Sequence, residues 1–201
     1  MKTFNNLPAN TNGNREDWLQ AAVELMTDNF IAAGYKVPEI RVSCGFPSRG
    51  ATSMSKLTIG QCWSSASARD GRAQIFISPL LEDNITVLAT LVHEVVHAVV
   101  GTAAGHGATF RKCAVLNGLT GKMTATVSTP SLRMRIRDWV RELGDYPHAQ
   151  LSAMRKVTQS TRLIKCVCEE CGYTVRTTAK WLGALGTPIC PCNNESMAVS
   201  E

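Results

Sequence analysis

The residues best suited to chemistry form a His-Glu-x-x-His sequence followed by a third histidine. His93 and His97 are four residues apart, so both imidazoles leave the same face of an α-helix. That spacing suits two nitrogen ligands on one zinc ion. Glu94 lies beside them, close enough to a zinc-bound water to act as a general base without being a ligand. His106, flanked by glycines just beyond the expected helix, can turn back as the third ligand.

The surroundings of this motif favour a metal site over a chance match. The predicted helix is otherwise strongly apolar, so its two histidines and its glutamate need partners. Three of the chain's four histidines fall between His93 and His106. The alternative is a buried helix whose histidines are hydrogen-bonded within the core. The fourth histidine, His148, is expected to be an isolated surface residue.

A second candidate metal site lies near the C-terminus, where five of the eight cysteines fall between Cys166 and Cys192. Without a recognisable export signal, such clustering favours metal over disulfides. Cys168 and Cys171, followed by glycine, form a turn that presents two thiolates. In extended chain Cys190 and Cys192 point to one side, so both sulfurs can reach one ion. We predict a structural zinc on Cys168, Cys171, Cys190 and Cys192, with Cys166 as a substitute ligand.

Basic and aromatic residues surround this predicted zinc module. Those that could contact nucleic acid are Lys165, Arg176, Lys180 and Trp181. Basic residues interleaved with aromatic ones can hold a nucleic-acid strand. The alternative is that Trp181 covers the small core of the module, and the sequence does not separate the two. A predicted helix over 132–143 carries Arg133, Arg135, Arg137 and Arg141, a pattern more typical of a solvated face than of a binding site.

Helices and short strands are predicted around the histidine motif from hydrophobic periodicity and turn residues. Three strand-like runs follow one another with short connections, which predicts an antiparallel sheet. Asp83 or Asn84 can cap the helix that carries the motif. The other predicted elements are helices over 15–33, 108–116 and 132–143, strands over 40–44, 57–63 and 73–78, and a loop over 120–130.

Composition limits the class of protein. The chain has 201 residues, and its hydrophobic content of 44% is ordinary for a globular protein. No apolar run approaches the roughly 18–20 residues that span a bilayer, so no membrane association is expected. The N-terminus is too polar for a signal peptide, which predicts a cytoplasmic location. The net charge of +5 is compatible with nucleic-acid binding without requiring it.

With both motifs placed, the chain resembles the SprT-like zinc metallopeptidases. The resemblance covers roughly residues 15–192. It is carried by His93-Glu94-x-x-His97, by Gly105-His106-Gly107-x-x-Phe110 opening a helix, and by the C-terminal zinc ribbon. The most similar members are the short SprT-like proteins of bacteriophages and actinobacteria, which have stretches like 122–126 and 146–148 here. One departure is the Cys190-x-Cys192 pair, where many zinc ribbons have Cys-x-x-Cys.

The resemblance implies an α+β fold, with a small zincin-like metallopeptidase domain followed by a C-terminal zinc ribbon. The zincin domain would consist of a helix, an antiparallel sheet and the helix that carries the histidine motif. Two zinc ions are implied, one catalytic and one structural. The expected organisation is a disordered N-terminus over 1–14, the peptidase domain over 15–148, a basic linker over 149–164 and the zinc ribbon over 165–195.

The resulting hypothesis is a zinc-dependent endopeptidase with protein substrates. Relatives of the Spartan type cleave proteins crosslinked to DNA, which implies DNA-associated or DNA-crosslinked substrates and DNA as a further partner in a bacterial or phage-infected cell. The substrate backbone is expected to add as an extra strand beside residues 73–78. The alternative is a non-proteolytic, transcription-associated zinc protein that binds nucleic acid. Nothing in the sequence defines an oligomeric state.

Overall fold

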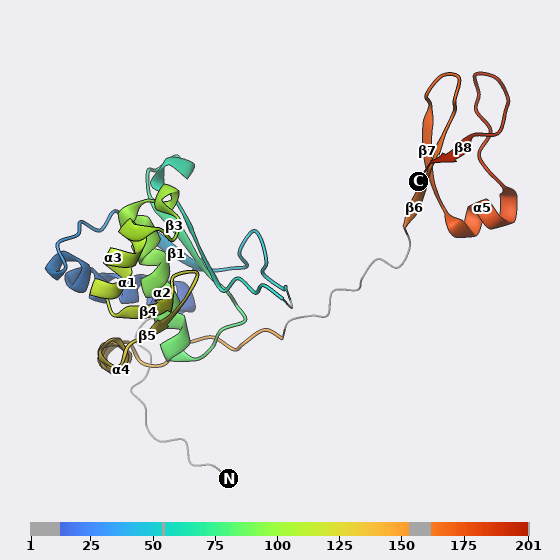
Figure 1. The fold of residues 1–201 in the computed structure, drawn as a ribbon. Helices are drawn as coiled ribbons and strands as arrows, with labels where there is room; N and C mark the ends of the chain where they lie inside the picture. The colour runs from blue at the N-terminus through green and yellow to red at the C-terminus, as the bar shows by residue number, and fades with distance from the viewer. Residues whose placement is uncertain (1–12, 54, 153–161, 201) are drawn as a thin grey trace, which may run out of the picture. The chain divides into compact units, whose positions relative to one another are not determined.

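The chain folds into two compact units, residues 1–154 and 155–201 (Figure 1). The computed structural model describes residues 13–53, 55–152 and 162–200. No helix in these ranges is both long enough and apolar enough to cross a bilayer.

The predicted disordered N-terminus and basic linker fall largely outside the described residues, which omit 1–12 and 153–161. Residues 149–152, at the start of the predicted linker, contact the first unit. The backbone N–H of Leu151 donates to the carbonyl of Pro79 at 2.9 Å. Its predicted end overlaps a strand that begins at Leu163.

Helices of the first unit begin at side-chain caps of the kind that the sequence suggests. Asn14, Asp83 and Thr129 each accept a hydrogen bond from a backbone N–H of the first helical turn. The elements in order are α1 (Arg15–Ala32), β1 (Ile40–Cys44), β2 (Gly60–Trp63), β3 (Ala73–Ile77), α2 (Asn84–Val100), α3 (Ala108–Leu116), β4 (Leu119–Lys122), β5 (Ala125–Ser128) and α4 (Pro130–Leu143), with single 3-10 turns at Ser65–Ser67 (η1) and Thr102–Ala104 (η2).

The main sheet is mixed, with strand order β1-β3-β2. Strand β3 pairs in parallel with β1 and antiparallel with β2, so that Ile75 lies between Val42 and Cys62. The prediction of an antiparallel sheet is therefore wrong for β1. The segment between β1 and β2 is long enough for β3 to insert between them. The prediction that a substrate strand adds beside residues 73–78 is wrong too, because β3 is paired on both sides.

The core of the first unit lies between the sheet and its helices. Strand β3 alternates, with Ala73, Ile75 and Ile77 buried. Helix α1 buries Trp18 and Phe30, and α2 buries a broad apolar face. Both helices contact the sheet, so α2 is fixed against β2 and β3.

Strands β4 and β5 form a hairpin over the segment predicted to be a loop. Leu119 pairs with Ser128 and Lys122 with Ala125, which leaves Met123 and Thr124 as the turn. The loop prediction is wrong because the Thr-rich stretch has the β-branched side chains that suit strands.

The second unit is a small three-stranded antiparallel sheet with one short helix. Its elements are β6 (Leu163–Val167), β7 (Thr174–Thr178), α5 (Ala179–Leu185) and β8 (Ala198–Ser200), with β6 in the centre of the sheet. Its core consists of Cys166, Cys168, Cys190 and Met197, against which Val175 and Leu182 pack. So small a core supplies little burial, which is the situation in which a metal ion stabilises a domain.

Candidate metal centre and surrounding cleft

The three motif histidines come together beside α2. Nε2 of His106 lies 3.2 Å from Nε2 of His93 and 3.2 Å from Nε2 of His97. Tetrahedral zinc with Zn–N bonds of about 2.0–2.1 Å requires ligand nitrogens about 3.3–3.4 Å apart. The three imidazoles therefore fit a single zinc ion, and no further ligand from the described residues joins them, so one coordination position would be open.

A glycine-rich turn brings His106 back to the helix. Gly101, whose φ is 84°, caps the C-terminus of α2, and Gly105, whose φ is 51°, caps that of η2. Side chains other than glycine are strained at such positive φ values. The backbone N–H of Gly107 donates to the carbonyl of Ala104 at 3.2 Å, and α3 starts immediately afterwards.

Phe110 packs against all three imidazole rings. Its ring centroid lies 4.9 Å from that of His93, 4.4 Å from that of His97 and 4.9 Å from that of His106. The side chain is fully buried in the core. Packing against one rigid ring fixes the ring orientations of all three candidate ligands.

Thr126 of the β4–β5 hairpin orients His93. Its Oγ1 lies 2.9 Å from Nδ1 of His93. When Nδ1–H donates to this hydroxyl, the lone pair of Nε2 faces the other two histidines, which is the tautomer that binds a metal. Sequence reasoning missed Thr126 because it placed this residue in a loop, and the contact joins segments far apart in the chain.

Burial keeps the candidate ligands neutral. It lowers the pKa of His93 to about 3 and that of His97 to about 4, and the neighbouring imidazoles add to the effect in both. The pKa of His106 is also lowered by burial. Neutral imidazole is the form that binds metal ions, so no proton has to be displaced at neutral pH.

Glu94 follows His93 on α2 and lines the same cleft, with only 6% of its surface exposed. Burial raises the pKa of its carboxyl to about 8, and a hydrogen bond from the backbone N–H of Cys62 partly opposes that rise. The same surroundings raise the pKa of the Cys62 thiol to about 12, chiefly through burial and also through the charge of Glu94.

Gly60 lets β2 approach α2 at this point. A Cβ atom there would lie 2.6 Å from Oε1 of Glu94 and 2.7 Å from Cγ2 of Thr90. No side chain fits in that space without a shift. Gly60 is a second functional position that sequence reasoning missed, since nothing local separates it from the chain's other glycines.

A cleft of about 660 Å³ opens over the histidines and Glu94. One wall is the chain from Leu57 into β2, and the other is the hairpin from Thr124 to Ser128. Among the described residues that line it there is no tyrosine, and Arg133 is the one arginine. The volume of the cleft and its two walls allow an extended chain to reach the candidate metal position.

Four cysteine sulfurs converge in the second unit. The Sγ–Sγ distances are 3.7 Å for Cys168 and Cys192, 3.6 Å for Cys171 and Cys190, and 3.4 Å for Cys190 and Cys192. Tetrahedral zinc with Zn–S bonds of about 2.3 Å requires sulfurs about 3.7–3.8 Å apart, so the four fit one ion. Cys166 lies outside this group, fully buried in the core on β6.

Two matching turns present these sulfurs. The carbonyl of Cys168 accepts a hydrogen bond from the N–H of Gly172, and that of Cys190 accepts one from Asn194. The expectation that Cys190 and Cys192 lie in extended chain is wrong, because residues 191–193 form a turn. Asn194 takes a positive φ of 57°, which asparagine tolerates better than most residues. In the first turn, the backbone N–H of Cys171 lowers the pKa of Cys168 to about 7.

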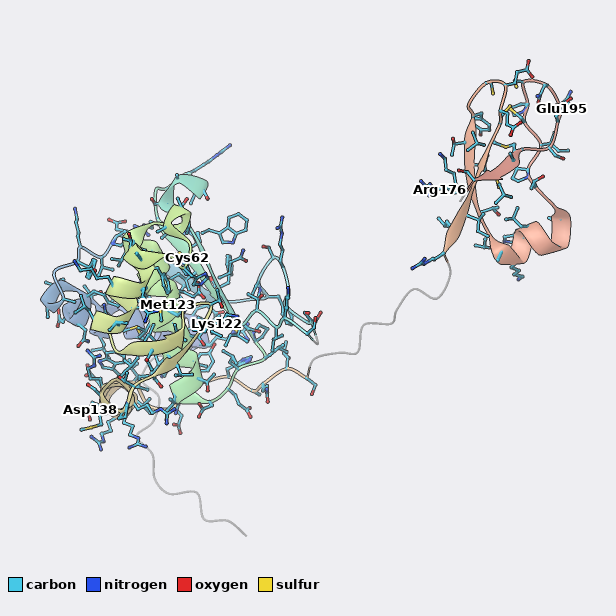
Figure 2. The ribbon with its side chains drawn as sticks, in the orientation of Figure 1. Cys62, Lys122, Met123, Asp138, Arg176 and Glu195 are labelled. Carbon is cyan, nitrogen blue, oxygen red and sulfur yellow. The ribbon has the colours of Figure 1, made fainter. Side chains whose placement is uncertain are left out.

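The four predicted nucleic-acid contacts fall into two separate pairs. Lys165 and Arg176 are opposite each other in the β6–β7 ladder. They alternate with the core-facing Cys166, so they share the outer face of the sheet, from which Arg176 projects in Figure 2. Lys180 lies over the ring of Trp181 on α5, 5.0 Å from its centroid. Trp181 is 51% exposed and does not cover the core; Leu182 packs there instead.

Two other expectations about polar residues are corrected. His148 is half-buried rather than isolated, with Nδ1 3.2 Å from a guanidinium nitrogen of Arg15 and Nε2 3.0 Å from the carbonyl of Pro79. Arg135 is not part of a solvated face, because it donates to Oδ1 of Asn29 at 3.0 Å and to the carbonyl of Asn117 at 2.9 Å. On the outer side of the same helix, Asp138 projects into solvent and pairs with Arg141 (Figure 2).

Comparison of the chain with models of protein families, with curated proteins and with solved structures found no match. Function therefore has to be inferred from the two sites themselves. Within the described residues, the three histidines and the four cysteines are the groups whose ligand atoms lie within 4.8 Å of one another. Both groups could hold a metal ion.

Proposed function

We propose that the first unit is a zinc-dependent endopeptidase of the SprT-like type. The observation that carries this proposal is the position of Glu94, buried beside three convergent imidazoles at the base of an open cleft. Structural zinc sites usually have four protein ligands, whereas catalytic sites have three and an open position. The three histidines with one neighbouring carboxylate match the second kind.

Glu94 acts as the general base in this proposal. Zinc, when bound, supplies Lewis-acid activation of water and of the scissile carbonyl. Glu94 takes a proton from the attacking water and passes it to the leaving amine. The backbone N–H of Cys62 and the close approach of Gly60 hold the carboxylate in place for both transfers.

Strand β2 is the edge at which a substrate would dock. It pairs with β3 on one side only, and among the described residues no strand covers its other side, where an extended peptide could pair. Residues of β2 also line the cleft next to Glu94. A peptide added there would pass over the candidate zinc position with its carbonyl groups held in register.

The test is the substitution Glu94→Gln in the full chain. We expect zinc content to be unchanged and cleavage of an unfolded protein substrate to fall by at least about a hundredfold, because proton transfer is lost. Glu142→Gln, an exposed change on α4, is the matched control and should cleave normally. Cleavage by Glu94→Gln at the wild-type rate would overturn the proposal.

A second function is favoured by Lys165 and Arg176. Like charges directly opposite each other destabilise a sheet, and a bound polyanion relieves that repulsion. We propose that the second unit binds nucleic acid and recruits the peptidase to DNA-associated or DNA-crosslinked proteins. The non-proteolytic alternative keeps this binding and dispenses with cleavage.

Salt dependence tests this second function. Replacing both Lys165 and Arg176 by alanine removes two phosphate contacts, so the slope of log K against log salt for single-stranded DNA should fall by about 1.4. Lys180→Ala tests the other predicted pair, on α5, separately. An unchanged slope in the double variant would exclude the outer sheet face as the binding surface.

A further inference from the structure

The cleft extends beyond the histidines along the N-terminal half of α2. Thr86 and Ala89 line this arm, and Thr86 is seven residues before His93. Seven helical residues span about 10 Å, whereas an extended peptide advances about 3.3 Å per residue. The arm therefore accommodates about three substrate residues on one side of the scissile bond.

Arg133 of α4 lines the same cleft beside its hairpin wall. Its Nε donates a hydrogen bond to Oγ of Ser128 at 3.2 Å. Thr126, which contacts His93, is two residues earlier on the same strand. Two strand residues span about 6–7 Å, which is the length of about two residues of an extended substrate. Ser128, to which Arg133 bonds, therefore lies about two substrate residues away from the contact of Thr126 with His93. Its guanidinium is placed for a neighbouring substrate group rather than for the scissile carbonyl.

The charge of Arg133 is not balanced within the cleft. No other lysine or arginine, and no carboxylate except Glu94, is found among the described residues that line it. The ion pairs of the described chain do not include Arg133, and its single hydrogen bond leaves both terminal NH2 groups without a protein partner there. Ile85, Ala89 and Val127 add apolar surface to the lining of the same cleft.

We infer that Arg133 is a specificity-determining residue that binds a carboxylate of the substrate, an inference that rests on the proposed peptidase function. A guanidinium presents paired N–H donors that match the two oxygens of a carboxylate. The carboxylate has two sources, an Asp or Glu side chain within about three residues of the scissile bond or the C-terminus of a short substrate. A free C-terminus would make the enzyme act near chain ends.

The test uses a set of fluorescent peptides that differ in one position at a time. Each position within three residues of the cleavage site carries Glu, Gln or Lys, and a second series has free or amidated C-termini. Binding is measured by fluorescence anisotropy with zinc-loaded Glu94→Gln, which should bind without cutting, and cleavage is measured with the wild type. We expect one position, or the free C-terminus, to bind about tenfold more tightly as a carboxylate than as its amide.

Charge reversal identifies the residue responsible. Arg133→Glu, made alone and with Glu94→Gln, should abolish the carboxylate preference and favour Lys at the same position. Arg137→Glu, one turn further along α4 and outside this cleft, should keep the original preference. Thermal transitions equal to that of the wild type in both reversals would show that folding is unaffected.

The outcomes separate this inference from the proposed function. Cleavage without any preference for a carboxylate, an unchanged preference in Arg133→Glu, or no binding by any peptide would overturn the role of Arg133. A preference that depends on Arg133 in binding, with no cleavage by the wild type, would support that role and contradict the peptidase proposal.

Discussion

Gly60 and Glu94 are so close that a Cβ atom on residue 60 would lie 2.6 Å from Oε1 of the carboxylate. This contact connects the edge strand to the candidate general base. Any movement of β2 away from α2 therefore alters both the substrate-docking edge and the position of Glu94.

Gly60→Ala should reduce cleavage by about a hundredfold while zinc content stays at the wild-type level, because a displacement of about 1 Å at a catalytic group has effects of that size. Zinc is measured by elemental analysis and cleavage with an unfolded protein substrate. Gly183→Ala is the control, since a Cβ there meets no atom within 4 Å. Full activity in Gly60→Ala would mean that β2 or Glu94 shifts to accommodate the added methyl group without loss of function.

Thr126→Val should weaken zinc binding at the histidine site by about 10–100-fold, because it removes the hydroxyl that fixes the tautomer of His93 and keeps the shape of the side chain. Competition with a chromophoric chelator gives the affinity. Thr120→Val, an exposed change on β4, should have no effect. Equal affinities in the two variants would show that Thr126 does not position His93.

Cys168→Ser should lower the zinc content from two ions per chain to one, whereas Cys166→Ala should retain both. The reason is that the sulfur of Cys168 faces three others, while Cys166 lies in the core. Elemental analysis measures the zinc content. His93→Ala should lose the other zinc ion, the one at the histidines. A wild-type chain with one zinc, lost only in Cys168→Ser, would argue against a zinc site at the histidines.

Arg135→Ala should destabilise the first unit by about 1.5–3 kcal/mol, because its guanidinium donates to two acceptors that belong to different segments. Arg137→Ala on the same helix should change stability by less than about 0.5 kcal/mol. Urea unfolding followed by tryptophan fluorescence reports on the buried Trp18 and Trp139. Similar midpoints for the two variants would contradict the bridging role of Arg135.

Local patterns were enough to predict which histidines and cysteines come together as candidate metal ligands. His93 and His97 share a helical face because of their spacing alone, and the turn at Cys168 and Cys171 is likewise set by near neighbours. Helix caps at Asn14 and Asp83 follow from the same short-range chemistry. Such interactions are encoded within a few residues, so the sequence alone reveals them.

The parts that sequence reasoning missed depend on contacts between distant segments. The sheet was predicted to be antiparallel because the parallel pairing of Val42 with Ile75 is not visible in either strand by itself. Thr126 meets His93, and Gly60 meets Glu94, across more than thirty residues each. The position of Arg133 at the cleft likewise depends on how α4 packs beside the hairpin, which the sequence does not show.

The glycine-rich turn between His97 and His106 would give a bound metal ion a further role as a crosslink. An ion bound to both residues would close a short ring of chain around Gly101 and Gly105, much as a disulfide closes a loop. Removing the ion would reopen that ring and free a stretch of backbone to enter the active site of another protease. Limited proteolysis between residues 101 and 107 would then report metal loss directly, without any assay of the protein's own activity.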